Sequence, residues 1–280
     1  MVFITTAGKV GTEATRLLAE RDIPVRVLVR SPEKASTLAA VGAEVVIGDL
    51  DDRATIDAAM DGVTRVILVT APVVAQELNV IESAVRAGVE HVVKITSKAS
   101  VDSPILRRRW QTEIEEALSA SGLPHTLLRN NAYMQNFLML APAIAKTGSF
   151  SSSAGTGQVG FIDARDVAAV ATAIAASPTR HVGKTYLPTG PELLSYGDVA
   201  GTLSNVLHRS ITFSARTVEE DKQAMMSVGV PEPIAAQNAS AFALIAAGDA
   251  AWITDDVSAI LGHPARRFEQ FANDYADAFG

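Results

Sequence analysis

Short runs of β-branched and aliphatic residues alternate with amphipathic segments through the first half of the chain. These runs cover residues 2–5, 25–29, 44–47, 66–70, 92–96 and 126–128. Runs that are apolar on both faces are typical of parallel strands covered by helices on each side. Between them, helical spacing places Val10, Ala14, Leu17 and Leu18 on one apolar face, and Leu78, Ile81, Ala84 and Val85 on another. Strict alternation of this kind predicts a doubly wound parallel-sheet Rossmann core of the α/β class.

The pattern changes near residue 148, where glycines and the serines 151–153 predict a loop or hairpin. Asp163 then stands where an N-cap is expected, ahead of a helical run over 167–176. A strand over 185–188, a helix over 195–207, a short strand near Ile211 and further helices to Phe279 follow. We predict a Rossmann core over residues 1–150 with a further core segment near 159–190. Residues 191–280 are expected to form mainly a small, α-rich C-terminal substrate cap.

Composition narrows the classes of protein that fit this pattern. A chain of 280 residues with 48% hydrophobic and 20% charged residues can form a large core domain plus a smaller cap. The net charge is −7 and the isoelectric point is about 5.3, so neither nucleic acid nor an anionic membrane is an expected partner. We expect a monomer or a homodimer.

Cysteine is absent, which excludes disulfides, thiolate metal sites and cysteine nucleophiles. The five histidines show no metal-ligand spacing, so no metal is expected. The chain has no signal-peptide pattern and no run of about 18 apolar residues. A cytoplasmic protein without a transmembrane helix is therefore expected.

The sequence Thr5-Thr6-Ala7-Gly8-Lys9-Val10-Gly11 lies between the first strand and the first helix. A pyrophosphate needs close approach to the backbone, and the helix N-terminus behind the turn supplies free N–H groups. Gly8 would permit the close approach, and Gly11 the tight packing of helix on strand. Thr5 stands where the usual motif has its first glycine, so either the turn is made differently or cofactor binding is weakened. The alternative is a glycine-bearing turn that binds nothing.

The second strand ends at Arg30, about 20 residues after the turn, where NAD-binding proteins carry an acidic residue. Arginine at this position suits a 2′-phosphate, and Ser31 and Lys34 follow it. This pattern favours NADP(H) over NAD(H), unless Arg30 is only a solvated charge at a strand end. Asp49, after the third strand, is suited to the adenine amino group or is an ordinary turn aspartate.

Several motifs together resemble the NmrA-like atypical short-chain dehydrogenases, and within them the triphenylmethane reductases and quinone oxidoreductases. The motifs are Thr6-x-Gly8-x-x-Gly11, Val29-Arg30-Ser31, Gly48-Asp49-Leu50, Ser121-Gly122-Leu123-Pro124, the run 128–136, Lys184-Thr185-Tyr186 and Gly229-Val230-Pro231-Glu232-Pro233. Their order and spacing cover nearly the whole chain. They are specific for the superfamily and not for one substrate.

The resemblance implies positions for a bound dinucleotide at the carboxyl ends of the strands. The pyrophosphate would meet Thr6, Gly8, Lys9, Val10 and Gly11, and the adenosine phosphate would meet Arg30 and Lys34. Asp49 and Leu50 would flank adenine, and Thr70, Ala71 and Pro72 would pass beneath the ribose. The nicotinamide and a small aromatic substrate would be bordered by Thr96, Ser97, Lys98, Asn130, Asn131, Ala132 and Tyr133.

The acid–base chemistry of typical short-chain dehydrogenases is missing. None of the four tyrosines has a lysine four residues later, so the usual Tyr-x-x-x-Lys pair is absent. The resemblance places Gln111 where relatives often carry histidine, and glutamine cannot transfer a proton. Tyr133 and Lys98 remain the candidates for a proton or hydrogen bond, with a packing tyrosine and a solvated lysine as the alternatives.

The run Arg107-Arg108-Arg109 stands near a predicted helix N-terminus, where cations oppose the helix dipole. Salt bridges to Glu113, Glu115 or Glu116 would explain it, and an anionic substrate or an acidic partner is the alternative.

Three functions fit these residues. The first is an NADPH-dependent reductase of a quinone or other aromatic acceptor, since hydride transfer needs mainly positioning. The second is a redox-sensing regulator that binds the dinucleotide without turnover. The third is a tailoring enzyme of aromatic polyketides, an oxygenase or reductase on the same fold.

Overall fold

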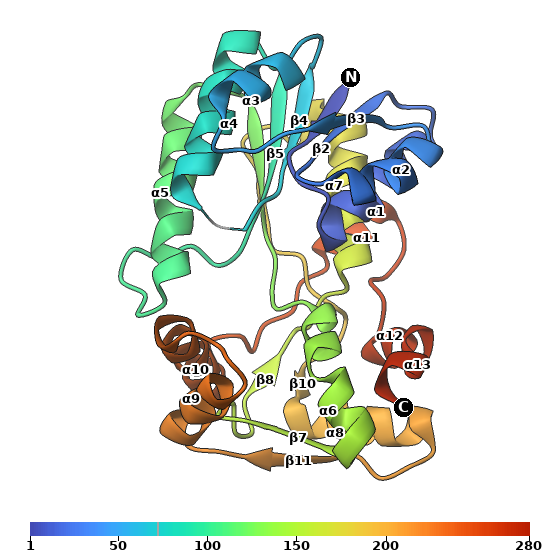
Figure 1. The fold of residues 1–280 in the computed structure, drawn as a ribbon, viewed down its shortest axis with the longest axis vertical. Coiled ribbons are helices and arrows are strands. Elements are labelled where there is room, and N and C mark those ends of the chain that lie inside the picture. The colour runs from blue at the N-terminus through green and yellow to red at the C-terminus, as the bar shows by residue number, and fades with distance from the viewer. Residues whose placement is uncertain (72) are drawn as a thin grey trace.

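The computed structural model describes residues 1–71 and 73–280 and has a central sheet of parallel strands (Figure 1). Its strand order is β3-β2-β1-β4-β5-β6-β9. The strands are β1 (Val2–Ile4), β2 (Val25–Val29), β3 (Glu44–Ile47), β4 (Arg65–Leu68), β5 (His91–Thr96), β6 (His125–Arg129) and β9 (Thr185–Tyr186). All seven predicted core strands are confirmed, with ends that differ by at most two residues. The strand order reverses between β1 and β4, the point where open α/β sheets bind ligands.

Helices cover both faces of the sheet, which confirms the predicted Rossmann core (Figure 1). One face is packed by α1 (Lys9–Ala19), α2 (Pro32–Ala40), α7 (Ala164–Ala176) and α11 (Asp256–Leu261). The other is packed by α3 (Arg53–Ala59), α4 (Val74–Ala87) and α5 (Leu106–Ala120). The predicted faces of α1 and α4 are confirmed except at Val85, which is 46% exposed. Ile81 and Ala84 face the sheet. Val85 follows Ala84 and is therefore rotated about 100° around the helix, away from the sheet.

The remaining elements gather below the sheet as a cap (Figure 1). They are η1 (Met134–Met139), α6 (Ala141–Thr147), β7 (Ser149–Ser152), β8 (Gln158–Val159), β10 (Leu194–Ser195), α8 (Tyr196–Leu207), β11 (Thr212–Ala215), α9 (Val218–Ser227), α10 (Glu232–Ala246), α12 (Phe268–Asp274) and α13 (Ala276–Phe279). A short turn, η2 (Pro178–Arg180), precedes β9. The cap has its own apolar cluster around Phe137. The centroid of the Phe137 ring lies 5.1–5.4 Å from the ring centroids of Phe161, Phe268 and Tyr196.

The segment after residue 148, expected to be a loop or a hairpin, forms two short strands joined by a turn. β7 pairs in parallel with β11, and β8 pairs antiparallel with β10, so the hairpin is wrong and both strands instead join later parts of the chain. The apolar cluster of the cap includes residues from Met134 to Phe279 and therefore spans both sides of residue 150. The division of the chain at residue 150 stays a prediction.

Asp163 caps α7 as predicted, because its Oδ1 accepts a hydrogen bond of 2.8 Å from the Arg165 backbone N–H. The same oxygen accepts from Gln135 Nε2 at 2.8 Å. These contacts tie η1 of the cap to the helix that returns to the core.

Candidate functional site

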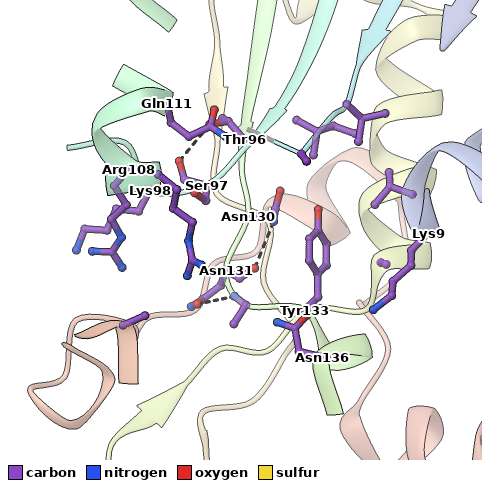
Figure 2. Close-up of a pocket in the computed structure, with 18 of the residues that line it drawn as sticks. Lys9, Thr96, Ser97, Lys98, Arg108, Gln111, Asn130, Asn131, Tyr133 and Asn136 are labelled. Atoms are coloured by element: carbon purple, nitrogen blue, oxygen red, sulfur yellow. Dashed lines mark hydrogen bonds between the residues drawn. The ribbon is translucent and has the colours of Figure 1, made fainter. Parts of the chain in front are cut away.

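A cavity of about 480 Å³ opens at the carboxyl ends of β1, β4, β5 and β6, beside the cap (Figure 2). Its volume is in the range of small-molecule sites. Predicted site residues that line it are Thr6, Gly8, Lys9, Val10, Thr70, Ala71, Thr96, Ser97, Lys98, Gln111, Asn131 and Tyr133. The cavity therefore joins the glycine-bearing turn to the residues expected beside a nicotinamide and a substrate.

The turn after β1 is built without a glycine at residue 5. The Thr5 hydroxyl donates to the Val69 carbonyl at 2.8 Å and accepts from the Val69 backbone N–H at 2.9 Å. The Thr6 hydroxyl donates to the same carbonyl at 2.7 Å. These hydrogen bonds link the end of β1 to the end of β4. The turn is thus made differently from that of the usual motif, which is the first of the two outcomes expected for Thr5.

The two glycines of the turn have different surroundings. A Cβ atom on Gly8, the N-cap of α1, would meet no atom of the described residues within 4 Å, and no described side chain caps this helix end. The first-turn N–H groups of α1 are therefore left for a ligand. A Cβ atom on Gly11 would lie 1.8 Å from the Thr6 carbonyl oxygen. Gly11 thus serves the close packing of helix on strand, as predicted.

The residues expected at the adenosine end lie beside this turn and outside the cavity lining. Arg30 is exposed and forms no ion pair within residues 1–71 and 73–280. Lys34 Nζ lies 3.4 Å from the Ala7 carbonyl oxygen, which places its charge over the turn. The Asp49 carboxylate accepts from the Asp51 backbone N–H at 3.0 Å.

Three more residues were expected at this end, and they are Leu50, Pro72 and Ser31. Leu50 is buried in the core cluster beneath α3 and α4, so its side chain is a packing residue. Pro72 lies outside the described residues. Ser31 is half-buried at the N-cap of α2.

Gln111 is held at the inner wall of the cavity by Thr96 (Figure 2). The Thr96 hydroxyl lies 2.8 Å from Gln111 Oε1 and 3.0 Å from Glu115 Oε1. Glu115 in turn pairs with Arg129, whose Nε is 3.1 Å from the carboxylate. This network fixes the Gln111 amide in place, and it offers the cavity a hydrogen-bonding group that does not ionise.

Tyr133 stands at the middle of the cavity, next to Asn130 (Figure 2). Burial raises the pKa of the Tyr133 phenol well above its usual range, against a smaller lowering by Asn130. The hydroxyl therefore stays protonated and is able to donate. Asn130 Oδ1 is buried and has no hydrogen-bond partner within the described chain, while its Nδ2 donates to the Asn131 carbonyl at 3.3 Å. An unpaired buried acceptor in a cavity is a place for a ligand N–H group.

Asn131 faces the cap. Its Nδ2 donates to the Ala250 carbonyl at 3.0 Å, and its Oδ1 accepts from the Ala132 N–H at 2.8 Å. The side chain expected beside the cofactor thus holds the loop between α10 and α11 against the core.

Lys98 and Arg108 reach the same cap loop. Lys98 Nζ lies 2.6 Å from one Asp249 carboxylate oxygen, and Arg108 Nη2 lies 2.7 Å from the other. The expected pairing of the arginine run with Glu113, Glu115 or Glu116 is wrong, because Asp249, 141 residues further along the chain, approaches Arg108 in the fold. Lys98 is a paired cation at the rim of the cavity.

A buried ion pair supports the floor of the site and was not predicted. Glu77 in the first turn of α4 and Lys94 in β5 are both fully buried, with Lys94 Nζ 2.5 Å from Glu77 Oε2. Glu77 Oε1 accepts from the hydroxyl of Thr70, a cavity residue, at 2.6 Å. A lysine inside the otherwise apolar run 92–96 was the signal that could have indicated this pair.

The cap contributes lining residues that lie outside the sequence motifs, and Asn136, the last residue of the motif run 128–136. The residues outside the motifs are Ala241, Ile245, Asp249, Ala250 and Trp252. Within the described part of the chain, no helix is long and apolar enough to cross a membrane. Over residues 1–71 and 73–280, no group of acidic or histidine side chains is arranged to hold a metal ion.

The fold and the position of the cavity define a Rossmann-type α/β protein with a ligand site between core and cap. The chain belongs to the NmrA-like family, whose profile matches residues 1–259. This confirms the resemblance carried by the motifs.

Three known proteins illustrate the similarity. An NAD(P)H azoreductase of Xenophilus azovorans is 39% identical over 278 residues, covering 98% of this chain and 96% of that protein. An NADPH-dependent quinone oxidoreductase of Escherichia coli, solved with NADPH, superposes with a TM-score of 0.89 at 28% identity, covering 99% of this chain and all of the other. A triphenylmethane reductase of Citrobacter, solved with NADP(H), gives a TM-score of 0.85 at 27% identity, covering 96% and 98%.

Proposed function

We propose that this NmrA-like NAD(P)H-dependent oxidoreductase uses NADPH to reduce a quinone, an azo compound or another aromatic acceptor. The observation that carries the proposal is the single cavity that joins the glycine-bearing turn to Tyr133 and Gln111. A dinucleotide and a flat acceptor would meet in this one space. The names of the azoreductase, quinone oxidoreductase and triphenylmethane reductase relatives support the same class of reaction.

The residues present fit a nicotinamide dinucleotide. The open space at Gly8 and the uncapped start of α1 suit a pyrophosphate, with Lys9 as a nearby cation. Arg30 and Lys34 suit a 2′-phosphate, and Asn130 Oδ1 suits the amide of the nicotinamide. Such a cofactor, when bound, supplies the hydride.

The acceptor gains negative charge as it is reduced, and Tyr133 is placed to respond to that charge. Its phenol stays protonated because burial raises its pKa, so it donates a hydrogen bond to the acceptor oxygen or nitrogen. Gln111 orients the acceptor and transfers no proton. Lys98 remains paired with Asp249 at the rim. Water supplies the final proton in this scheme.

Alanine substitutions at Gly8 and Gly11 should affect different properties. Gly8→Ala should weaken NADPH binding, and Gly11→Ala should lower the stability of the fold. Gly8→Ala adds a methyl group into open space, so the free energy of unfolding should change by less than about 1 kcal/mol while NADPH affinity falls on the order of tenfold. Gly11→Ala forces the helix off the Thr6 carbonyl and should cost about 1–3 kcal/mol of stability. Urea unfolding and calorimetric titration measure the two effects. Loss of stability in Gly8→Ala with unchanged affinity would contradict this division of roles.

Removing the Arg30 side chain should weaken the binding of NADPH and leave the binding of NADH unchanged. Arg30→Ala deletes a charge-assisted contact to the 2′-phosphate, so the Kd for NADPH should rise by on the order of tenfold or more, about 1.5–3 kcal/mol. The Kd for NADH should stay the same. Arg21→Ala, an exposed arginine beyond the far end of α1, is the matched control. An equal loss for both nucleotides would overturn the 2′-phosphate assignment.

Multiple-turnover kinetics test the proposed reaction. The purified protein, given NADPH and naphthoquinone or an azo dye, should consume many equivalents of NADPH per chain. Tight NADPH binding with no turnover of any acceptor would favour the regulator. Oxygen uptake with a polyphenolic substrate, continuing without nicotinamide, would favour the oxygenase.

A further inference from the structure

We propose that the end of the cavity between α5 and the cap binds an anionic group on the acceptor, such as a sulfonate, carboxylate or phosphate, through Arg107. This inference rests on the proposed function and names a class of substrate for it. The acceptor would then be an aromatic anion, with its ring beside Tyr133 and its charge at the start of α5.

The first argument is the charge of the cavity wall. Four cations line it, and they are Lys9, Lys98, Arg107 and Arg108. Among the described lining residues, the only carboxylate is that of Asp249. The chain as a whole carries a net charge of −7, so this concentration of positive charge is local to the site. A wall of one sign raises the local concentration of ligands of the opposite sign.

The second argument is the distribution of partners among these cations. Asp249 is already shared by Lys98 and Arg108. Arg109 donates to the Ser103 carbonyl at 2.6 Å and is absent from the described cavity wall. Arg107 lines the cavity, yet no acceptor within residues 1–71 and 73–280 receives a hydrogen bond from its guanidinium. Lys9, on the cofactor side, donates to the Gln135 carbonyl at 3.0 Å. Among the four lining cations, Arg107 is therefore the one whose donors are all left for a ligand within the described residues.

The third argument is electrostatic. Arg107 lies in the first turn of α5, where the helix dipole adds positive charge. The Arg107 side chain is exposed at the edge of the cavity, where partial desolvation and the neighbouring Arg108 lower its pKa without removing its charge. A bound anion would relieve this repulsion and accept two parallel hydrogen bonds from the guanidinium.

The surroundings also separate this subsite from the phosphates of the cofactor. In Figure 2, Lys9 lies on one side of Tyr133, while Lys98 and Arg108 lie on the other. The cap side of the cavity is apolar apart from Asn136 and Asp249, with Ala241, Ile245 and Trp252 in the wall. An aromatic ring suits that wall, and an anionic substituent at its edge suits Arg107.

The test compares naphthoquinone with naphthoquinone sulfonate as acceptors for the wild-type protein and Arg107→Gln. The wild type should prefer the sulfonate, and the preference should fall as salt is added. In Arg107→Gln, kcat/KM for the sulfonate should drop on the order of tenfold or more through KM, with the neutral quinone changed less than about twofold. Carboxylate and phosphate analogues then show which anion the subsite favours.

Arg109→Gln is the matched control, because it removes the same charge from the same run but not from the cavity wall. The sulfonate preference should survive in this variant. Equal losses for both quinones in Arg107→Gln, or a loss of NADPH affinity instead of acceptor affinity, would overturn the subsite.

A binding measurement keeps the subsite testable if the wild type reduces neither quinone, which would contradict the proposed function. Calorimetric titration with naphthalene sulfonate should then show binding to the wild type and to Arg109→Gln. Binding should weaken on the order of tenfold in Arg107→Gln. Equal binding to all three proteins would overturn the subsite by itself.

Discussion

Replacing Glu77 with leucine should lower the free energy of unfolding by about 3–5 kcal/mol, because it leaves the buried Lys94 ammonium without its partner. Both side chains have no exposed surface, so water cannot compensate for the missing carboxylate. Among the described residues, the Lys94 ammonium would keep its hydrogen bond to the Ile95 carbonyl, at 2.9 Å. Urea unfolding followed by circular dichroism measures the loss as a lower midpoint at an unchanged slope.

The double variant Glu77→Leu with Lys94→Met is the matched control. Replacing a buried ion pair with apolar residues of similar volume is often neutral or stabilising, so most of the lost stability should return. A single Glu77→Leu variant that loses less than about 1 kcal/mol would contradict this role of the ion pair. The pair also bears on the site, since Glu77 accepts from the Thr70 hydroxyl in the cavity wall.

Acidification should destabilise the protein through His91, by on the order of 3 kcal/mol between pH 6.5 and about 4. His91 is 1% exposed in β5, and its Nε2 lies 3.0 Å from the Thr126 hydroxyl. Burial lowers its pKa to about 4, helped by the charges of His125, His181 and Arg65.

The direction of this stability change follows from the protonation of His91 in the unfolded and in the folded protein. In the unfolded chain His91 takes up a proton near pH 6.5, whereas in the folded protein it does so only near pH 4. Stability due to neutral His91 is therefore complete above pH 6.5 and is lost as the pH falls toward 4. Burial lowers the pKa of His181 as well, which acts in the same direction.

Unfolding free energies measured across this pH range test the assignment to His91. The pH dependence should become shallower in His91→Gln and should persist in His263→Gln, which changes an exposed histidine. An unchanged slope in His91→Gln would assign the acid sensitivity to other groups.

The sequence by itself determined the Rossmann core, the turn between β1 and α1, and the family. Each of these depends on local patterns: the apolar strands, the helical spacing from Val10 to Leu18, and the separation of Gly8 from Gly11. The N-cap at Asp163 was equally local, because one side chain and the following N–H groups suffice to define it. Backbone sterics and the period of the apolar residues act over a few residues, so they can be read without the fold.

Only the tertiary structure decided which side chains meet in the cavity. Arg108 pairs with Asp249 across 141 residues and not with a glutamate on its own helix. Glu77 and Lys94 come together through the packing of α4 on the sheet, and Asn131 turns to the cap loop. Arg107 is left with donors for a ligand as a result. Such pairings depend on how helices pack on the sheet and how the cap lies against the core, and no local period encodes the distance between residues far apart in the chain.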